Sequence, residues 1–189
     1  MKLRNKNLKI LRDNHVYSEE MEHDACGVGL VASTEGLKSR KVVEYGIDAL
    51  KAVWHRGAID ADGKTGDGAG IHIEIPKDFF EEKIEVTGHK HDNSELCVGM
   101  IFLPRNDYSA QEQCRTIVES ELTKRNFSIY GWRQVPVDPS VLGEKAEQTR
   151  PEITQVLFTY NDKKVVNKSL EQKLYETRRV IEKKLSIIN

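Results

Sequence analysis

The stretch DACGVGLVA, residues 24–32, joins a charged N-terminal segment to the first apolar run of the chain. Residues 1–25 contain five Lys/Arg and five Asp/Glu, with little apolar periodicity. A short apolar run that follows such a segment predicts a buried strand over residues 26–32. We therefore interpret residues 1–25 as a leader or propeptide, and we place Cys26 at the start of the first core element.

Cys26 has a possible chemical role that depends on removal of the leader. Cleavage before it would create an α-amine with a pKa of about 7.7–8.0 beside a thiol with a pKa of about 8.5. The amine could then accept the thiol proton and later pass it to a leaving group. Gly27 and Gly29 would leave room for a substrate against the backbone. The alternative is a buried strand cysteine, and composition alone favours it, because free cysteine is often buried.

The bulk composition excludes several functional classes. The chain has 189 residues, is 38% hydrophobic and carries a formal charge of -1, which gives no field to attract nucleic acid or an anionic membrane. It contains no apolar stretch near the roughly 20 residues that span a bilayer, and no secretory signal, so we expect a cytoplasmic protein. Its three cysteines are far apart in sequence, which argues against a disulfide scaffold.

In the first half of the chain, apolar spacing predicts one helix and one further strand. Ser39 is a candidate N-cap, and Gly57 follows the predicted helix. The apolar positions of this helix are Val43, Ile47, Leu50 and Trp54. Five glycines between residues 57 and 70 predict a shaped loop. The alternation of Ile71, Ile73 and Ile75 then predicts a half-buried strand.

The second half predicts two strands and two helices. The run 96–103, which Pro104 ends, is typical of an interior strand, and residues 153–160 form another apolar run. Capping patterns at Ser109 and Ser169 predict the starts of two helices. Their expected buried positions are Cys114, Ile117, Val118 and Leu122 in the first, and Leu170, Leu174, Ile181 and Leu185 in the second. Residues 131–151 contain three of the five prolines and are expected to form an irregular surface excursion.

Two weaker patterns favour ordinary loops. His89, His91 and Asp92 could suggest a metal, but a His-x-His pair without another nearby ligand is more often solvated. The glycines of residues 66–70 lack the third glycine of a dinucleotide-binding fingerprint and precede a predicted strand instead of a helix. We therefore expect neither a metal nor a nucleotide at these places.

Several ordered motifs resemble the class II glutamine amidotransferases, which are N-terminal-nucleophile hydrolases. They are CGVGL at 26–30 and WHRG at 54–57. The loop DGKTGDGAG at 62–70 is similar to that of the glutaminase domain of glutamate synthases, as are VGMIFLP at 98–104 and GWRQVPVD at 131–138. The resemblance runs from about residue 21 to near the C-terminus, and agreement of several motifs in order is more specific than any one of them.

The resemblance implies a role for individual residues. Cys26 would be the nucleophile that attacks the side-chain amide of L-glutamine, giving a thioester and ammonia, and Arg56 would lie beside it. Without the motif, Arg56 reads as an arginine that interacts with the C-terminus of a helix. The supporting residues would be Gly27, Gly57, Asp67 and Gly68, which shape the site without a chemical step. Trp54 is expected to pack in the core.

The resemblance also implies the fold and the wider assembly. The fold would be α+β, a four-layer αββα sandwich over residues 26–189 that is incomplete at its C-terminal side. FMN and an iron-sulfur cluster would belong to the parent enzyme and not to this chain. Partners would be the remainder of the large subunit, or a complementing chain, and a small electron-donating subunit. A non-catalytic remnant or interaction module of the same fold is the alternative function.

We predict that the 189-residue chain alone has no useful glutaminase activity. The family's oxyanion hole uses an Asn-Gly pair, and no Asn-Gly dipeptide occurs in this sequence. Loss of one oxyanion donor typically slows acyl transfer roughly 100- to 1000-fold. Ammonia release from glutamine should equal that of a Cys26→Ala control, and it should rise when the remainder of the domain is supplied. Robust turnover by the chain alone would contradict this expectation.

Overall fold

The structure is a computed structural model that describes Lys6, Lys9 and residues 27–54, 57–91, 94–162 and 167–187. It divides into two compact units, and each is described by itself. The first unit comprises Met1–Ile59 with Gly66–Ile71, and the second comprises Asp60–Thr65 with His72–Asn189.

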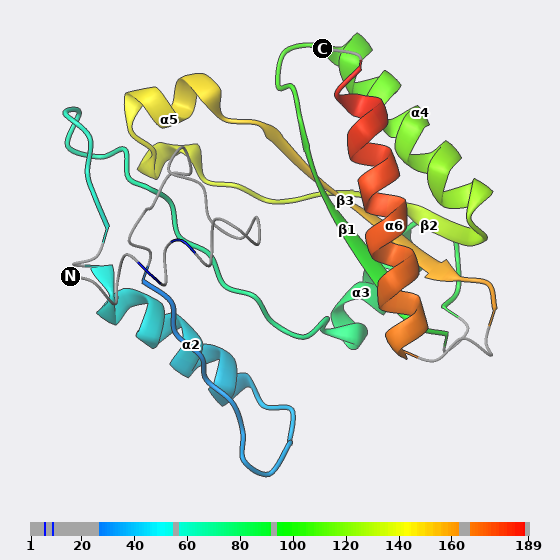
Figure 1. The fold of residues 1–189 in the computed structure, drawn as a ribbon, viewed down its shortest axis with the longest axis horizontal. Coiled ribbons are helices and arrows are strands. Elements are labelled where there is room, and N and C mark those ends of the chain that lie inside the picture. Colours follow the sequence, from blue (N-terminus) through cyan, green and yellow to red (C-terminus); the bar gives the residue numbers. More distant parts are fainter. Residues whose placement is uncertain are drawn as a thin grey trace. The chain divides into compact units, whose positions relative to one another are not determined.

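The second unit is built on a three-stranded antiparallel sheet in the order β1-β3-β2 (Figure 1). The strands are β1 (Leu96–Leu103), β2 (Phe127–Gln134) and β3 (Glu152–Tyr160). β3 pairs with both neighbours, and residues 154–159 are buried without interruption. A continuous buried run is expected for a central strand whose two faces are both covered.

Helices α4 (Tyr108–Lys124) and α6 (Asn167–Leu185) cover one face of the sheet and lie side by side in Figure 1. Val118 and Leu122 of α4 and Leu170 of α6 pack against Val156 and Phe158 of β3 in one cluster. A fully buried aliphatic side chain contributes about 1.5–3 kcal/mol through burial. This layer is therefore the main hydrophobic core of the unit.

Helix α3 (Lys77–Val86) covers part of the opposite face. Its Phe80 and Ile84 pack against Leu157 of β3, together with Leu96 and Tyr130. The cover is incomplete, because Phe102 of β1 is 64% exposed and Met100 is also exposed. Within the described residues β1 pairs only with β3, so it is an edge strand in this sheet and the predicted interior position is wrong.

A β-bulge in β2 lets Ile129 and Trp132 face one cluster while Tyr130 between them faces the cluster beneath α3. Ile129 pairs with Phe158 and Gly131 pairs with Leu157, so Tyr130 is the additional residue on its strand. A bulge of this kind turns one side chain toward a different face of the sheet. Without it, Tyr130 could not share the cluster of Phe80 while Ile129 and Trp132 both pack against the opposite one.

The strands and helices predicted in the second half are confirmed, with changes at their ends. The carboxylate of Asp107, and not the predicted Ser109, caps α4 by accepting the N–H of Ala110 at 2.9 Å. α6 begins at Asn167, two residues before the predicted Ser169. The predicted irregular excursion over 131–151 is wrong in part. It contains the end of β2, a short 3-10 helix η2 (Pro139–Val141) and α5 (Glu144–Thr149). Neither the strand β2 nor the helix α3 was predicted.

The first unit contains α2 (Arg40–Ala52), and the predicted N-cap is confirmed because Ser39 Oγ accepts the N–H of Lys41 at 3.2 Å. Trp54 lies beyond the end of this helix and is 77% exposed, so its predicted core position is wrong. The helical spacing that suggested burial does not extend past Ala52.

The two strands predicted in the first half are absent from the described parts of residues 26–32 and 71–75. Val28 and Leu30 are exposed, as are Ile71 and Ile73. A strand is defined by hydrogen bonds to a partner strand, and neither segment has such a partner among the residues described. The apolar patterns of these two segments are therefore typical of strands, but the described residues of both segments form no strand pairing.

The described residues establish a mixed helix and strand fold with helices on both faces of one small antiparallel sheet. The second sheet of a four-layer sandwich is not among these residues. None of the helices in the described ranges is both long enough and apolar enough to cross a membrane.

Glu121 of α4 joins the two helices that cover the main core. It is only 3% exposed, and its carboxylate accepts hydrogen bonds from Lys184 of α6 and from Arg125, each at 2.5 Å, and from Lys124 at 3.2 Å. The bonds from Lys184 and Arg125 lower the pKa of Glu121 to about 2, from 4.5. The buried carboxylate is therefore stabilised in its charged form by three cations.

We predict that Glu121→Gln lowers the melting temperature of the chain at pH 7 by at least about 5 °C, because it removes the shared counter-charge of three cations. Since the pKa is lowered in the folded state, this stabilisation is present above pH 4.5 and is lost as the pH falls toward 2. The difference in melting temperature between wild type and Glu121→Gln should therefore become smaller as the pH falls from 4.5 toward 2. Thermal unfolding, monitored by circular dichroism at each pH, measures these melting temperatures.

Glu112→Gln is the matched control, because Glu112 lies on the same helix and its partner is Arg115, but its side chain is well exposed. Exposed pairs contribute little to stability, so this control should melt close to wild type. Equal melting temperatures for the two variants would contradict the role given to Glu121.

Candidate functional site

The glycine-rich segment forms a hairpin after the WHRG motif. The N–H of Asp60 donates to the carbonyl of Thr65 at 2.7 Å, and the N–H of Gly63 donates to the carbonyl of Asp60 at 2.9 Å. An isolated bridge between Ile59 and Gly66 forms the next rung. The shaped loop predicted from five glycines is thus confirmed, as a hairpin with a tight turn over residues 60–65.

The carboxylate of Asp67 joins the second side of the hairpin to Ala58, the residue after Gly57. Its Oδ2 accepts the N–H of Ala58 at 2.9 Å, and the N–H of Gly57 donates to the carbonyl of Trp54 at 3.0 Å. Gly68 follows with a φ of +88°, a conformation that side-chain-bearing residues rarely adopt. These contacts constrain the backbone on the C-terminal side of residue 56.

The 60–65 turn is stabilised by the side chain of Asp62. Its Oδ2 accepts the Thr65 hydroxyl at 2.5 Å, and its Oδ1 accepts the backbone N–H groups of Thr65 and Lys64 at 2.7 and 2.9 Å. Donation by the Thr65 hydroxyl, followed by that of the two backbone groups, holds the pKa of Asp62 well below its usual range. The turn therefore keeps a charged Asp62 at neutral pH.

The structure brings together some of the residues predicted for the site. Gly57 is next to Ala58 in the chain. The N–H of Ala58 donates to the side chain of Asp67, and Gly68 follows Asp67 directly. Gly27 is exposed, and the neighbouring Gly29 would place a Cβ 3.9 Å from the Cβ of Ala49 on α2. Cys26 and Arg56 lie outside the described residues, so the catalytic role of Cys26 and the position of Arg56 stay predictions.

Neither of the two described cysteines has both the chemical environment and the position expected of the catalytic nucleophile. Cys97 is buried in the core of the sheet, and burial raises the pKa of its thiol to about 12. A thiol with such a pKa forms almost no thiolate near pH 7, and the thiolate is the reactive form. Cys114 is half-buried on α4, with Val118 and Leu122 of the same helix in the core. Neither belongs to the hairpin.

The sequence context of His91 predicts a solvated loop, but the structure shows that its side chain is buried. Its side chain is 5% exposed, its Nδ1 lies 3.0 Å from Oε1 of Glu81, and its ring meets that of Tyr130 edge to face. His89 lies 3.1 Å from the hydroxyl of Thr87. Within the described ranges, no group of three or more His, Cys, Asp or Glu side chains is placed to bind a metal.

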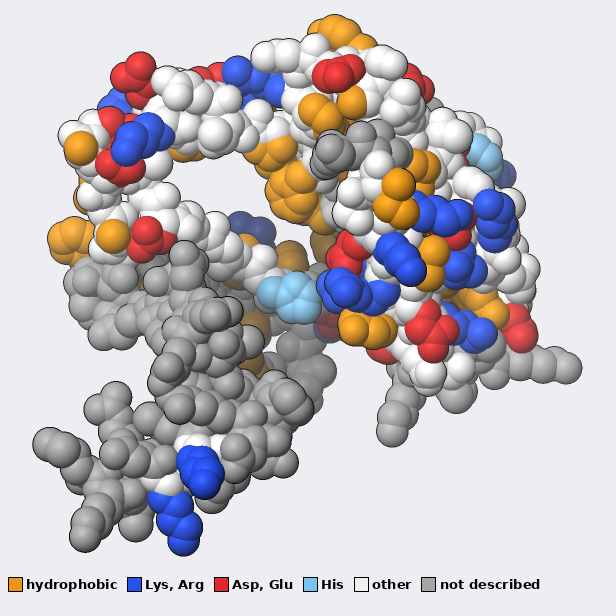
Figure 2. Space-filling view, turned by 45° about the horizontal axis from the view of Figure 1, so that its top comes forward, with side chains coloured by type: hydrophobic (Ala, Val, Ile, Leu, Met, Phe, Trp, Pro, Cys, Tyr) orange, Lys and Arg blue, Asp and Glu red, His pale blue; other side chains and the backbone are white. Residues whose placement is uncertain are grey.

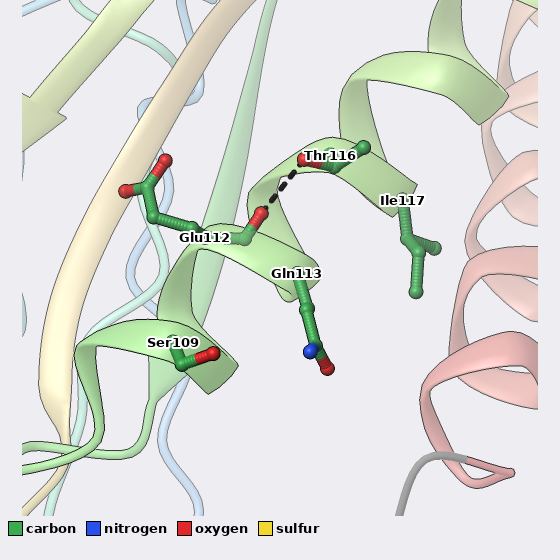
Figure 3. Close-up of a pocket in the computed structure, with 5 residues that line it drawn as sticks. All are labelled: Ser109, Glu112, Gln113, Thr116 and Ile117. Carbon is green, nitrogen blue, oxygen red and sulfur yellow. Dashed lines mark hydrogen bonds between the residues drawn. The ribbon is translucent and has the colours of Figure 1, made fainter.

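A shallow depression beside α4 contains none of the predicted site residues. Figure 3 shows that one helix supplies its lining, with the hydroxyl of Thr116 donating to the carbonyl of Glu112 at 2.8 Å. The lining residues are Ser109, Glu112, Gln113, Thr116 and Ile117. The hydroxyl of Thr116 is thus already bonded to its own helix, and Glu112 pairs with Arg115.

The contacts that order the 60–65 turn were not predicted from the sequence. Asp62 and Thr65 have the spacing of an Asx-type turn, in which an Asp side chain accepts backbone N–H groups a few residues ahead. The spacing of Asp62 and Thr65 could therefore have predicted this turn from the sequence. The Nζ of Lys145 also donates to Oδ2 of Asp60 at 2.7 Å, and no local pattern indicates this long-range contact.

The family of the glutamine amidotransferases class-II matches residues 26–189, and the chain belongs to this family. Among its relatives, the large chain of the NADPH glutamate synthase of Azospirillum brasilense is 53% identical over 177 residues. The match covers 94% of this chain and 12% of that protein.

Ferredoxin-dependent glutamate synthases are more distant relatives. The protein of Pyropia yezoensis is 35% identical over 180 residues, which covers 95% of this chain and 11% of the relative. The chloroplastic protein 2 of Arabidopsis thaliana is 36% identical over 177 residues, with 92% and 11% covered. The chain thus spans about a tenth of the length of the relatives that it matches.

Proposed function

We propose that residues 26–189 belong to the glutaminase domain of a glutamate synthase large subunit, which hydrolyses L-glutamine to glutamate and ammonia. The ammonia would serve glutamate synthesis from 2-oxoglutarate at a site outside this chain. The observation that carries the proposal is the family match, whose first residue is Cys26. A nucleophile at the first position of the matched region is what an N-terminal-nucleophile mechanism needs.

The setting of the other cysteines supports the choice of Cys26. Cys97 is excluded as a nucleophile near neutral pH by its buried position and raised pKa. Cys114 lies on α4, away in sequence from every motif shared with the family. Cys26 is the remaining cysteine of the three, and it directly precedes Gly27 in the CGVGL motif.

The proposed reaction proceeds in two stages. The free α-amine of Cys26 accepts the thiol proton while Sγ attacks the side-chain carbonyl carbon of glutamine. The C–N bond then breaks, and the proton held by the amine passes to the departing ammonia. Water, deprotonated by the same amine, hydrolyses the γ-glutamyl thioester and releases glutamate and the thiol.

In this proposal the hairpin orders the backbone that follows Arg56 in the chain. Arg56 is proposed to favour the thiolate and to bind a carboxylate or carbonyl oxygen of the substrate. The backbone that follows it is fixed by the bond from Ala58 to Asp67 and by the conformation of Gly68. Gly27 is proposed to leave space beside the nucleophile. In this proposal Asp67 acts through the backbone and does not touch substrate.

The cofactors of the parent enzyme are proposed to lie outside this chain. An iron-sulfur cluster generally uses four cysteine ligands, whereas the whole chain has three cysteines and Cys97 is enclosed by apolar side chains. The residues present therefore do not fit a cluster. FMN, the cluster and an electron-donating subunit are assigned to the rest of the synthase. A cytoplasmic location, predicted from the sequence, is part of the same proposal.

We predict that Cys26→Ser, in a full-length glutamate synthase carrying this segment, lowers glutamine-dependent glutamate synthesis by at least about 1000-fold, because the nucleophile is lost. Ammonia-dependent synthesis should remain within about twofold of wild type, since it does not need the thiol. Steady-state assays with glutamine and with ammonium as nitrogen donor measure the two activities.

Cys114→Ser is the matched control, because it removes a half-buried thiol elsewhere in the domain. It should retain both activities. Glutamine-dependent activity of Cys26→Ser within about tenfold of wild type would contradict the proposed function and would favour the alternative of a non-catalytic module.

A further inference from the structure

The side of β1 that faces away from β3, which we call the free edge of β1, has the composition of an interior strand. Among the described residues β1 pairs only with β3. Its sequence, LCVGMIFL, contains no charged residue and no proline, and its register with β3 runs without a bulge. Edge strands of natural proteins usually carry charges, prolines or bulges that prevent further pairing. β1 has none of these features.

β2, at the opposite edge of the sheet, carries the features that β1 lacks. Its sequence, FSIYGWRQ, includes the charged residue Arg133, and its register with β3 shifts between Ile129 and Gly131. Ser128 and Gln134 add exposed polar side chains to the same strand. The contrast between the two edges indicates that a further strand pairs with β1 and not with β2.

Two side chains of β1 leave an apolar surface beside its free edge. Met100 is 50% exposed and Phe102 is 64% exposed, whereas Leu96 is buried in the cluster beneath α3. The three residues share one face of the sheet, because side chains two positions apart on a strand point the same way. Side chains of a neighbouring strand lie about 4.5–5.5 Å from their partners. A strand on the free edge would therefore cover part of Met100 and Phe102.

The order of the elements starts to repeat one supersecondary unit. β1 and β2 run in the same direction, because each is antiparallel to β3, and α4 connects them over the face of the main core. α6 follows β3 beside α4 (Figure 1), with Leu170 in the same core and Ile181 packed against it. Two such interleaved units form the βαββαβ arrangement. Among the described residues, the second unit has its first strand and its helix but no second strand.

The handedness of these connections selects the edge that a strand after α6 would join. Connections between parallel strands of one sheet are right-handed in about 98% of cases. The connection from β1 through α4 to β2 passes the position of β3 in one direction. Because β3 runs the opposite way and α6 covers the same face, a connection of the same hand from β3 passes in the other direction. It crosses β1 and ends at the free edge.

We propose that the free edge of β1 binds an antiparallel strand from the segment that follows α6 in a full-length glutamate synthase large subunit. This inference rests on the proposed function, because it takes the chain as part of that subunit, and the chain spans about a tenth of the length of such relatives. The side chains of the strand that face α6 should be apolar, since they extend the main core. Connections between a helix and a strand usually take about 2–6 residues, so the strand should lie within roughly 20 residues after Leu185.

The test uses a full-length glutamate synthase carrying this segment, with the photoreactive residue p-benzoylphenylalanine in place of Phe102. Irradiation should join this residue to a peptide within roughly the 20 residues that follow Leu185, and mass spectrometry identifies the peptide. The same photoreactive residue in place of Tyr175 is the matched control, because Tyr175 is also exposed but lies on α6. The control should not react with that peptide.

Hydrogen–deuterium exchange of the unsubstituted protein gives a second readout. Alternate N–H groups of β1 point away from β3, because the hydrogen bonds of an antiparallel strand alternate between its two sides. In the 189-residue chain these N–H groups should exchange at least about 100-fold faster than in the full-length enzyme, where the added strand binds them. The N–H groups of β1 that face β3 should be protected in both proteins.

Each other occupant of the free edge gives a distinct result that overturns the inference. A crosslink to residues 27–32 or 71–75 would place another part of this chain there, and a crosslink between two copies would show a dimer. Equal exchange of the outward N–H groups in the two proteins would show that the edge stays free. This exchange result decides the matter if the photoreactive variant does not fold or does not react.

The proposed function fails on a different measurement. Glutamine-dependent activity of Cys26→Ser near that of wild type would contradict the glutaminase function and would leave the strand pairing intact. Loss of that activity in Cys26→Ser, together with a free edge on β1, would overturn the strand pairing alone.

Discussion

The antiparallel pairing of β3 with a strand on each side is the constraint on which the second compact unit depends. Leu157 and Val156 of β3 are almost fully buried and belong to different clusters, one beneath α3 and one beneath α4 and α6. Loss of such a side chain commonly costs about 2–5 kcal/mol for a leucine, because a cavity remains. The two helical layers are thus organised around alternate residues of a single strand.

Charged groups on the surface of this core have two distinct uses. Glu121 lies beneath three cations and links α4 to α6, whereas Glu147 links the end of β1 to α5 and so to the 60–65 turn. Basic and acidic side chains are interspersed over the visible face, in agreement with the formal charge of -1 (Figure 2). The chain therefore uses individual ion pairs between elements instead of a field of one sign.

Local patterns predicted two strands of the described sheet, β1 and β3, but they missed β2, which also pairs with β3. Residues 96–103 and 153–160 pair with each other as β1 and β3, and Ser39 caps α2 as expected. The predicted strands over 26–32 and 71–75 are absent from the described residues because apolar alternation does not itself supply a partner. Trp54 was misplaced because helical periodicity was extended past the actual helix end.

The candidate site was predictable in part. The glycine density of residues 57–70 indicated a shaped loop, and the motifs indicated the family that the match over residues 26–189 then established. The approach of Gly143 to Thr65, and the pairing of Lys145 with Asp60, depend on tertiary structure, so sequence spacing could not reveal them. The segment 131–151 was accordingly treated as a surface excursion, although part of it supports the turn of the site.

The central claim is that Cys26 acts with its own α-amine as general base, which requires that the bond before it be cut. Intact-mass measurement of an active full-length glutamate synthase carrying this segment tests the claim most directly. The account predicts a mature chain that begins at Cys26, with residues 1–25 removed. An enzyme that retains those residues and still hydrolyses glutamine at full rate would contradict it, because an amide nitrogen at residue 26 is not basic.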